Sequence, residues 1–247
     1  VRALEVDLVA FSYSDVSHTE VMHKASQVTA AGADFIIIGA PYTMLESTRK
    51  VVSVCAVRTG CGKSQASRQL FKVLTEAGKR VVTVRHPMPY GDLTKQVVQR
   101  FASYDDFDTH SCTIEEREEY EPIVDLGGVI YAGVDYEAIV RAAEQDPDGC
   151  DVILWDGGNN DFSFYQSDLY LTLVDPLRPG HEKIYYPGEM NVLLADALII
   201  NKIDSAPPEG IEQIRRIVHE VVPDAVLIEA ASPIRVEEPE LIKGKRV

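Results

Sequence analysis

Short apolar runs alternate with longer amphipathic stretches along the chain. Most of the apolar runs are continuous, which is typical of strands that are covered on both faces of a sheet. They predict strands at residues 7–11, 35–39, 51–56, 80–85, 152–155, 169–174, 197–200 and 225–229. The amphipathic stretches predict helices at residues 19–31, 63–77, 136–144 and 210–221. Because strands and helices alternate, the pattern predicts an α/β fold with a doubly wound, mostly parallel sheet.

The same pattern predicts two units. Residues 1–47 contain a strand, a helix and a strand, and we expect them to be part of a smaller N-terminal α/β domain. A linker near residues 46–50 leads into residues 48–247, which hold the remaining strands and helices. The chain begins with Val1 instead of Met, so we expect it to be a piece of a longer protein.

The first strand of the larger unit runs into the segment V-R-T-G-C-G-K-S at residues 57–64, and a predicted helix follows. This context is typical of a P-loop, the phosphate-binding loop of many nucleotide-binding proteins. Gly60 and Gly62 let the backbone curl so that its N–H groups point at phosphate oxygens. Lys63 is placed to reach the β- and γ-phosphates, and the Ser64 hydroxyl to bind Mg²⁺. Residues 48–247 are therefore predicted to be a P-loop nucleotide-binding domain.

The loop departs from the common pattern, because Val57 stands where a glycine is usual. It resembles the variant G-K-G-G-x-G-K-[ST] of the class that includes dethiobiotin synthetase and the ParA-like ATPases. Arg58 then takes the place of an extra lysine that reaches the phosphates across a homodimer in that class. The nucleotide-binding residues expected from the loop are Gly60, Cys61, Gly62, Lys63, Ser64 and Gln65, with Cys61 as a small spacer.

Two further motifs follow predicted strands. Asp156 follows the apolar run in C-D-V-I-L-W-D-G-G-N-N-D. An acid at the end of such a strand can hold the Mg²⁺ shell. A simple turn at the strand end would also explain an aspartate at this position. The segment A-L-I-I-N-K-I-D places Asn201, Lys202 and Asp204 in an N-K-x-D pattern that resembles the guanine-binding motif of GTPases. The carboxylate of Asp204 can accept two N–H bonds from guanine but not from adenine, so this motif favours GTP.

Cationic side chains occur in two other segments that follow strands. Arg85 and His86 lie in V-R-H-P-M-P-Y-G-D, and Arg178 and His181 lie in D-P-L-R-P-G-H-E. Loops that follow parallel strands gather at one edge of the sheet, where ligands bind. We therefore expect these four side chains to face the phosphates together. The alternative is that the segments are proline-rich loops whose cationic side chains bind no ligand.

Composition narrows the classes of function. The 247 residues carry a formal net charge of −15, which disfavours binding to nucleic acid or to an anionic membrane. No apolar run approaches the roughly 18 residues that would span a bilayer. The four cysteines form no C-x-x-C pair, so zinc and thioredoxin chemistry are not indicated and a reducing cytoplasm is expected.

Long segments spread over nearly the whole chain carry a family resemblance. They are V-M-H-K-A-S, A-G-A-D-F, C-A-V-R-T-G-C-G-K-S, V-R-H-P-M-P-Y-G-D-L, T-I-E-E-R-E-E-Y-E-P, Y-A-G-V-D-Y-E, W-D-G-G-N-N-D, R-P-G-H-E and N-K-I-D. Together they resemble the cyclic 2,3-diphosphoglycerate synthetase family, some members of which are described only as predicted GTPases. The resemblance implies an enzyme that uses ATP to close 2,3-diphosphoglycerate into a cyclic pyrophosphate.

The resemblance also implies roles for the candidate residues. Lys63, Arg58 and Mg²⁺ would hold the γ-phosphoryl group, with Asp156 in the metal shell. The cations Arg85, His86, Arg178 and His181 would neutralise a small phosphorylated substrate. The family activity uses ATP whereas the N-K-x-D motif indicates GTP, so both nucleotides remain open. The alternative is a regulatory or chaperone-like GTPase, in which the loops around Asp92 and Asp156 would be switches read by a protein partner.

Overall fold

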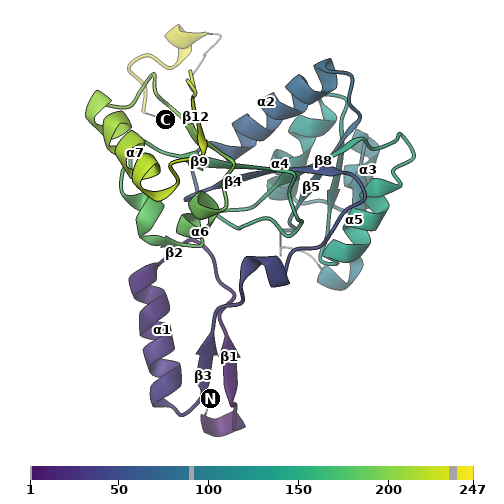
Figure 1. Cartoon of the computed structure of the whole chain (residues 1–247). Helices are drawn as coiled ribbons and strands as arrows, with labels where there is room; N and C mark the ends of the chain where they lie inside the picture. Colours follow the sequence, from purple (N-terminus) through teal and green to yellow (C-terminus); the bar gives the residue numbers. More distant parts are fainter. Residues whose placement is uncertain (1, 89–91, 234–237, 247) are drawn as a thin grey trace.

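The computed structural model describes residues 2–88, 92–233 and 238–246. Its main feature is an eight-stranded sheet with strand order β12-β11-β9-β4-β8-β5-β7-β6 (Figure 1). The strands are β4 (Lys50–Ala56), β5 (Val81–Arg85), β6 (Gln99–Phe101), β7 (Val129–Ala132), β8 (Val152–Asp156), β9 (Leu169–Val174), β11 (Ala197–Ile200) and β12 (Val226–Glu229). All neighbouring strands are parallel except β6 and β7. The predicted doubly wound, mostly parallel α/β sheet is confirmed.

Helices cover both faces of this sheet (Figure 1). On one face lie α2 (Lys63–Glu76), α3 (Tyr104–Thr109) and α4 (Ile114–Val124). On the other lie α5 (Tyr136–Glu144), α6 (Gly188–Leu193) and α7 (Pro208–Val221). Alternate residues of a strand pack against helices on opposite faces of the sheet. Val54 of β4 belongs to the same apolar cluster as Phe71 of α2, whereas Trp155 of β8 clusters with Ile139 of α5.

The N-terminal segment forms a separate unit that extends away from the main sheet (Figure 1). Strands β1 (Leu8–Ala10) and β3 (Asp34–Ile36) pair in parallel, and α1 (His18–Ala30) connects them. A short strand, β2 (Val16–Ser17), pairs with β10 (Tyr185–Tyr186) just before α6 and so attaches the unit to the larger domain. Strands β1 and β3 and helix α1 were predicted for residues 1–47, whereas β2 was not, and the domain boundary itself stays a prediction.

Several elements were not predicted from the sequence. Strands β6 and β7 have only three and four residues. Helix α4 contains the charge run at residues 115–121, and it begins with a capping box between Thr113 and Glu116. Glu116 is buried and accepts a hydrogen bond from Gln96 Nε2 at 3.0 Å, so one acid of this charge run faces the protein interior.

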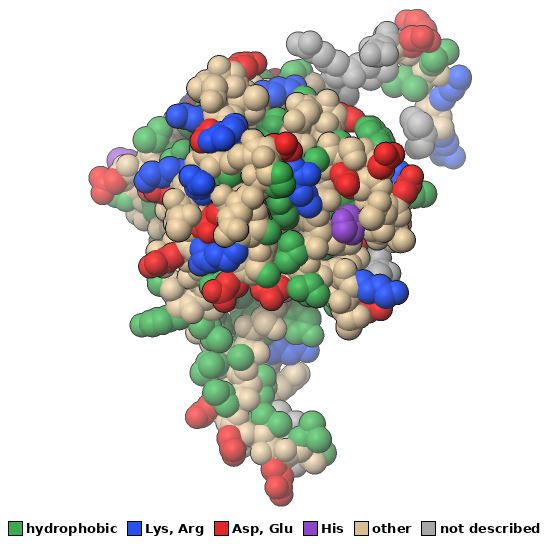
Figure 2. Space-filling model, turned by 90° about the vertical axis from the view of Figure 1, so that its right-hand side faces the viewer, with side chains coloured by type: hydrophobic (Ala, Val, Ile, Leu, Met, Phe, Trp, Pro, Cys, Tyr) green, Lys and Arg blue, Asp and Glu red, His purple; other side chains and the backbone are tan. Residues whose placement is uncertain are grey.

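The acidic net charge is not gathered into one patch on the face that Figure 2 shows. Lys and Arg side chains lie among Asp and Glu side chains over the larger domain. Hydrophobic side chains are frequent over the N-terminal unit, which projects below it. Among the described residues, no helix has the length and apolar character needed to cross a membrane.

Candidate nucleotide-binding site

The segment between β4 and α2 folds as a tight loop whose geometry depends on two glycines. Gly60 and Gly62 have φ angles of 84° and 102°, a region that disfavours side chains. A Cβ atom on Gly62 would lie 2.2 Å from Nδ2 of Asn201. The residue before α2 must therefore be glycine, and the N–H groups of the first helical turn remain free for a phosphate group.

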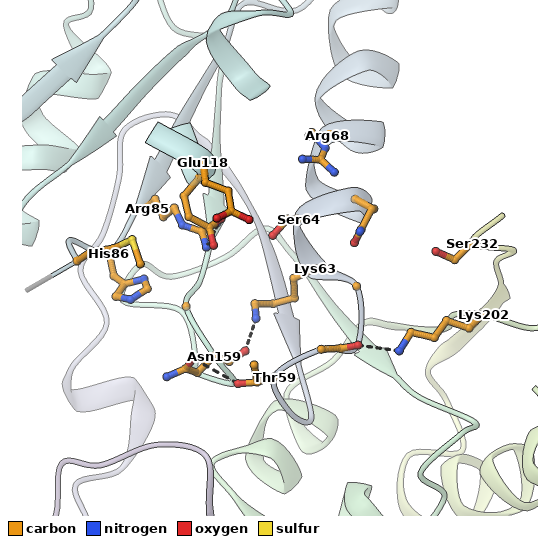
Figure 3. A pocket seen from close by; sticks show the side chains of 16 residues that line it. Thr59, Lys63, Ser64, Arg68, Arg85, His86, Glu118, Asn159, Lys202 and Ser232 are labelled. Carbon is orange, nitrogen blue, oxygen red and sulfur yellow. Dashed lines mark hydrogen bonds and ion pairs between the residues drawn. The ribbon is translucent and has the colours of Figure 1, made fainter. Parts of the chain in front are cut away.

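A cavity of about 590 Å³ opens beside this loop (Figure 3). Predicted site residues that line it are Gly60, Gly62, Lys63, Ser64, Gln65, Arg85, His86 and Lys202. They come from the loop and α2, from the segment after β5 and from the segment after β11. The carboxyl ends of these parallel strands thus bring together residues that lie far apart in the sequence. Residues 89–91, in the predicted V-R-H-P-M-P-Y-G-D segment, lie outside the described residues.

Lys63 points into the cavity and donates a hydrogen bond to the backbone carbonyl of Asn159, in the loop after β8 (Figure 3). Thr59 Oγ1 donates to Oδ1 of Asn159 at 3.3 Å, so the two loops are in direct contact. Burial lowers the pKa of the Lys63 ammonium group, and the nearby charge of Asp156 opposes this shift. A phosphate group at the loop would favour the charged ammonium form in the same way.

An ion-pair network lies beside the cavity, and its members Arg85 and Glu119 also line the cavity. Arg85 Nη1 donates to Asp156 Oδ2 at 2.7 Å, and Arg85 Nη2 lies 2.7 Å from Glu119 Oε2 of α4. Arg85 and Asp156 are 6% and 5% exposed. Because these charges are shielded from water, removal of one partner would leave the others without compensation.

Asp156 lies at the end of β8, and its Mg²⁺ role stays a prediction. Its second carboxylate oxygen, Oδ1, is buried and has no hydrogen-bond partner among the described residues. Ser64 lies at the start of α2 and lines the cavity, whereas Asp156 is not among the residues that line it. The described residues contain no cluster of three His, Cys, Asp or Glu side chains suited to a metal ion. A P-loop Mg²⁺ needs no such cluster, because phosphate oxygens and water complete its shell.

Ser64→Ala should raise the Mg²⁺ concentration needed for half-maximal turnover by ~10-fold or more, since a metal-binding oxygen is lost. Ser64→Thr is the matched control, because it keeps the hydroxyl group and the helix start. The measurement is a Mg²⁺ titration of nucleotide turnover for the three proteins. A wild-type Mg²⁺ response in Ser64→Ala would show that this hydroxyl does not bind the metal.

Asn201 and Lys202 of the N-K-x-D motif bond to the phosphate loop, and Asp204 lies against the segment after β12. Asn201 Nδ2 donates to the carbonyl of Cys61 at 2.9 Å, and Lys202 Nζ donates to the carbonyl of Gly60 at 2.7 Å. The carboxylate of Asp204 accepts a hydrogen bond from the Ser232 backbone N–H at 2.9 Å. Ser232 and Lys202 both line the cavity, on the side opposite His86 and Arg85 (Figure 3). This arrangement is suited to hold a base next to the loop.

Asp204→Asn tests which base is bound. If guanine is the ligand, the substitution should weaken GTP binding by ~1–3 kcal/mol, since an acceptor of N–H bonds becomes an amide. The asparagine keeps an oxygen for the Ser232 N–H, so the loop contact should survive. Asp224→Asn, at an exposed position, is the control. Tight ATP binding that does not respond to Asp204→Asn would contradict a guanine site.

The remaining predicted cations lie elsewhere around the loop. Arg178 Nη2 donates to the carbonyl of Thr59 at 3.0 Å and pairs with Asp175 at 2.9 Å. The guanidinium carbon of Arg58 lies 3.9 Å from the ring centroid of Tyr185, and His181 also packs on Tyr185.

None of the side chains of Arg58, Arg178 and His181 lines the 590 Å³ cavity. The expected gathering of Arg85, His86, Arg178 and His181 around one cavity is therefore not formed. The substrate role of Arg178 and His181, and the γ-phosphate role of Arg58, stay predictions. Arg58 Nε lies 3.5 Å from Asp15 of the N-terminal unit, so within this chain it faces that unit.

Other residues of the site were missed. Arg68, Glu118 and Glu119 line the cavity, and Asp175 accepts a hydrogen bond from Lys202 at 2.8 Å. Arg68 lies one helical turn after Ser64, so the spacing alone could have placed it on the same face of α2. The sequence holds no comparable signal for Glu118 or Glu119, because their position depends on how α4 packs.

The strand order, the loop after β4 and the acid at the end of β8 together define the fold. It is that of a P-loop NTPase. A crystal structure of the hydrogenase maturation factor HypB from Archaeoglobus fulgidus is 16% identical, with a TM-score of 0.46 over 73% of this chain and 80% of that one. LpxK from Aquifex aeolicus, in complex with ATP, is 12% identical, with a TM-score of 0.48 over 89% of this chain and 79% of that one.

One relative was found by sequence. The chain is 59% identical over 247 residues to a protein named arginine synthetase ArcE from Thermococcus kodakarensis. The match covers all of this chain and 54% of the relative, so the chain spans about half the length of the curated relative that it matches. No family model matches the chain.

Proposed function

We propose that the protein is a nucleoside-triphosphate-dependent synthetase that converts a ureido group into a guanidinium group. The observation that carries this proposal is the 59% identity, over the whole chain, with a protein named arginine synthetase. The phosphate loop and the cavity beside it supply a site for the triphosphate. The product named for the relative then indicates the chemistry that the triphosphate must drive.

A guanidinium group forms when nitrogen replaces the oxygen of a ureido group, and this oxygen is a poor leaving group. In the first step the ureido oxygen attacks the γ-phosphorus, and the nucleoside diphosphate leaves with the bridging oxygen. In the second step ammonia attacks the activated carbon, and the carbon–oxygen bond breaks. Inorganic phosphate leaves with the former ureido oxygen and one proton from ammonia. The products are a guanidinium compound, a nucleoside diphosphate and inorganic phosphate.

The cavity residues suit the first step, which depends on positioning and charge. Lys63 would neutralise the β- and γ-phosphates. Ser64 and Asp156 would hold Mg²⁺, which neutralises phosphate charge when bound. The N–H groups at the start of α2 would orient the transferred phosphoryl group.

His86 suits the second step. Burial lowers the pKa of its imidazole, and the charges of Arg85 and Lys63 lower it further, so the ring is neutral near pH 7. Its Nδ1 atom is buried and has no hydrogen-bond partner among the described residues. A neutral ring of this kind can accept the proton that ammonia loses and pass it to the departing phosphate.

Cyclic 2,3-diphosphoglycerate synthesis, which the family resemblance implied, remains the second candidate. It shares the first step, in which an acceptor oxygen takes the γ-phosphoryl group. It also needs cations for a second polyanion. Arg85 already pairs with two carboxylates, and Arg178 pairs with Asp175 away from the cavity. We therefore favour the ureido acceptor.

A product assay separates the candidates. The purified protein is incubated with Mg²⁺ and either ATP or GTP, together with L-citrulline and ammonium or with 2,3-diphosphoglycerate. Mass spectrometry then measures arginine, cyclic 2,3-diphosphoglycerate and the nucleoside diphosphate. We expect arginine and nucleoside diphosphate in equal amounts. Formation of the cyclic product would establish the second candidate, and nucleotide hydrolysis indifferent to both substrates would indicate a regulatory GTPase.

A further inference from the structure

A second cavity, of about 400 Å³, lies next to the nucleotide cavity. It is enclosed by residues that follow β1 in the N-terminal unit and by the loop that follows β8 in the larger domain. His86 lines both cavities. A ligand in the second cavity would therefore lie beside the triphosphate, with the His86 ring at the boundary.

Aromatic rings are frequent in the lining of this second cavity. They belong to Phe11, Tyr13, Tyr136, Phe162, Phe164 and Tyr186. Several of them pack on one another, since the ring centroids of Tyr136 and Phe164 are 4.3 Å apart and those of Phe11 and Tyr186 are 5.8 Å apart. Among the described residues that line the cavity, none is lysine or arginine. Such a lining disfavours a polyanion and favours a flat or cationic group.

Of the described residues that line the cavity, Asp161 alone carries a carboxylate. Its side chain makes no hydrogen bond or ion pair with another residue in the described part of the chain. Its charge acts on groups nearby: it opposes the lowering of the pKa of His86 and helps burial to raise the pKa of Tyr136 to about 12. A half-buried carboxylate without a partner, among aromatic rings, is suited to bind a group with N–H donors.

We infer that this aromatic cavity binds the planar ureido or guanidinium end of an amino-acid side chain, held by Asp161 and the aromatic rings. The inference rests on the proposed function, for which it assigns the acceptor site. Two N–H groups of the planar end can donate to the two oxygens of Asp161, while the faces of the plane contact aromatic rings. The ureido oxygen then points away from Asp161, towards His86 and the nucleotide cavity.

Binding measurements test the role of the Asp161 carboxylate. Isothermal titration measures the affinity of L-arginine and of a non-hydrolysable triphosphate for wild type, Asp161→Asn and the exposed control Asp224→Asn. We expect Asp161→Asn to weaken L-arginine binding by ~10-fold or more, since a charge-assisted hydrogen bond is lost. Triphosphate affinity should stay unchanged in both variants, which also shows that they are folded. Equal L-arginine binding by Asp161→Asn and wild type would overturn the inference.

A second pair of variants tests the aromatic lining without disturbing the core. Tyr13 is 73% exposed and lines the cavity, whereas Tyr42 is 90% exposed and does not. Tyr13→Ala should weaken L-arginine binding, and Tyr42→Ala should leave it unchanged. Equal effects of the two substitutions would count against the cavity as the binding site.

The outcomes also distinguish failure of the proposed binding cavity from failure of the proposed reaction. If wild-type protein makes arginine from L-citrulline but Asp161→Asn and Tyr13→Ala keep the wild-type KM for L-citrulline, the reaction stands and the cavity assignment is wrong. If L-arginine binding depends on Asp161 but no nucleoside diphosphate forms with L-citrulline, the cavity stands and the proposed reaction is wrong.

Discussion

Lys63→Ala is expected to lower kcat for nucleotide turnover by ~10²–10³-fold, because it removes a positive charge placed where negative charge develops. Among the described residues, the Lys63 ammonium group makes its hydrogen bond to the backbone carbonyl of Asn159 and pairs with no carboxylate, so the fold should survive the substitution. Steady-state kinetics with saturating Mg²⁺ and nucleotide measure the effect, and the melting temperature shows whether the variant is folded.

Lys72→Ala is the matched control for this experiment. Lys72 lies on the same helix, α2, but at an exposed position away from the cavity. Its removal should leave kcat within a few-fold of wild type. A folded Lys63→Ala variant that turns over nucleotide as fast as Lys72→Ala would remove the phosphate loop from the mechanism.

Arg85→Ala should destabilise the protein by ~3–5 kcal/mol, because it leaves the buried carboxylate of Asp156 and the neighbouring Glu119 without a counter-charge. For a chain of this size the melting temperature should fall by ~10 °C. This result would differ from that expected of a simple phosphate ligand, whose removal affects ligand binding and leaves the fold intact. Thermal unfolding followed by circular dichroism is the measurement.

Two controls accompany the Arg85 experiment. Arg80→Ala removes a guanidinium group that is 59% exposed and pairs with Asp151 on the surface, so it should lower the melting temperature much less than Arg85→Ala does. The double variant Arg85→Met, Asp156→Asn removes both charges of one pair and should recover part of the lost stability. A melting temperature for Arg85→Ala equal to that of Arg80→Ala would show that the network does not stabilise the fold.

The parts of the site that were predictable depend on local sequence. The strand, loop and helix from β4 to α2 are continuous in the chain, so spacing alone placed Lys63 and Ser64. Asp156 was predictable for the same reason, because it directly ends β8. The contact between Asn201 and the Cys61 carbonyl was not predictable from the sequence. It depends on the strand order, in which β9 lies between β4 and β11.

The strand order explains why the predicted cation cluster is divided. Loops after parallel strands do meet at one edge, as expected for Arg85 and Arg178. However, β5 lies on the β8 side of the central strand β4, whereas β9 lies on its other side. Arg85 therefore enters the cavity, and Arg178 contacts the loop from the β9 side. A sequence pattern identifies strands but not their lateral order.

Short or uniformly charged elements were the hardest to predict. Strand β7 has four residues, and α4 carries acids on the side that faces the cavity as well as on the side that faces water. The aromatic cavity was also invisible in the sequence, because its rings come from segments as distant as Phe11 and Tyr186. Only the docking of the N-terminal unit through β2 and β10 brings them together.

The transfer of oxygen from the acceptor to phosphate tests the proposed reaction most directly. L-citrulline labelled with ¹⁸O in the ureido group is incubated with the protein, ammonium, Mg²⁺ and unlabelled nucleoside triphosphate, and the inorganic phosphate is analysed by mass spectrometry. The proposal predicts that the ureido ¹⁸O appears in inorganic phosphate, in step with arginine formation. Inorganic phosphate that carries no ¹⁸O, released by water while the label stays in L-citrulline, would contradict phosphoryl transfer to the ureido oxygen.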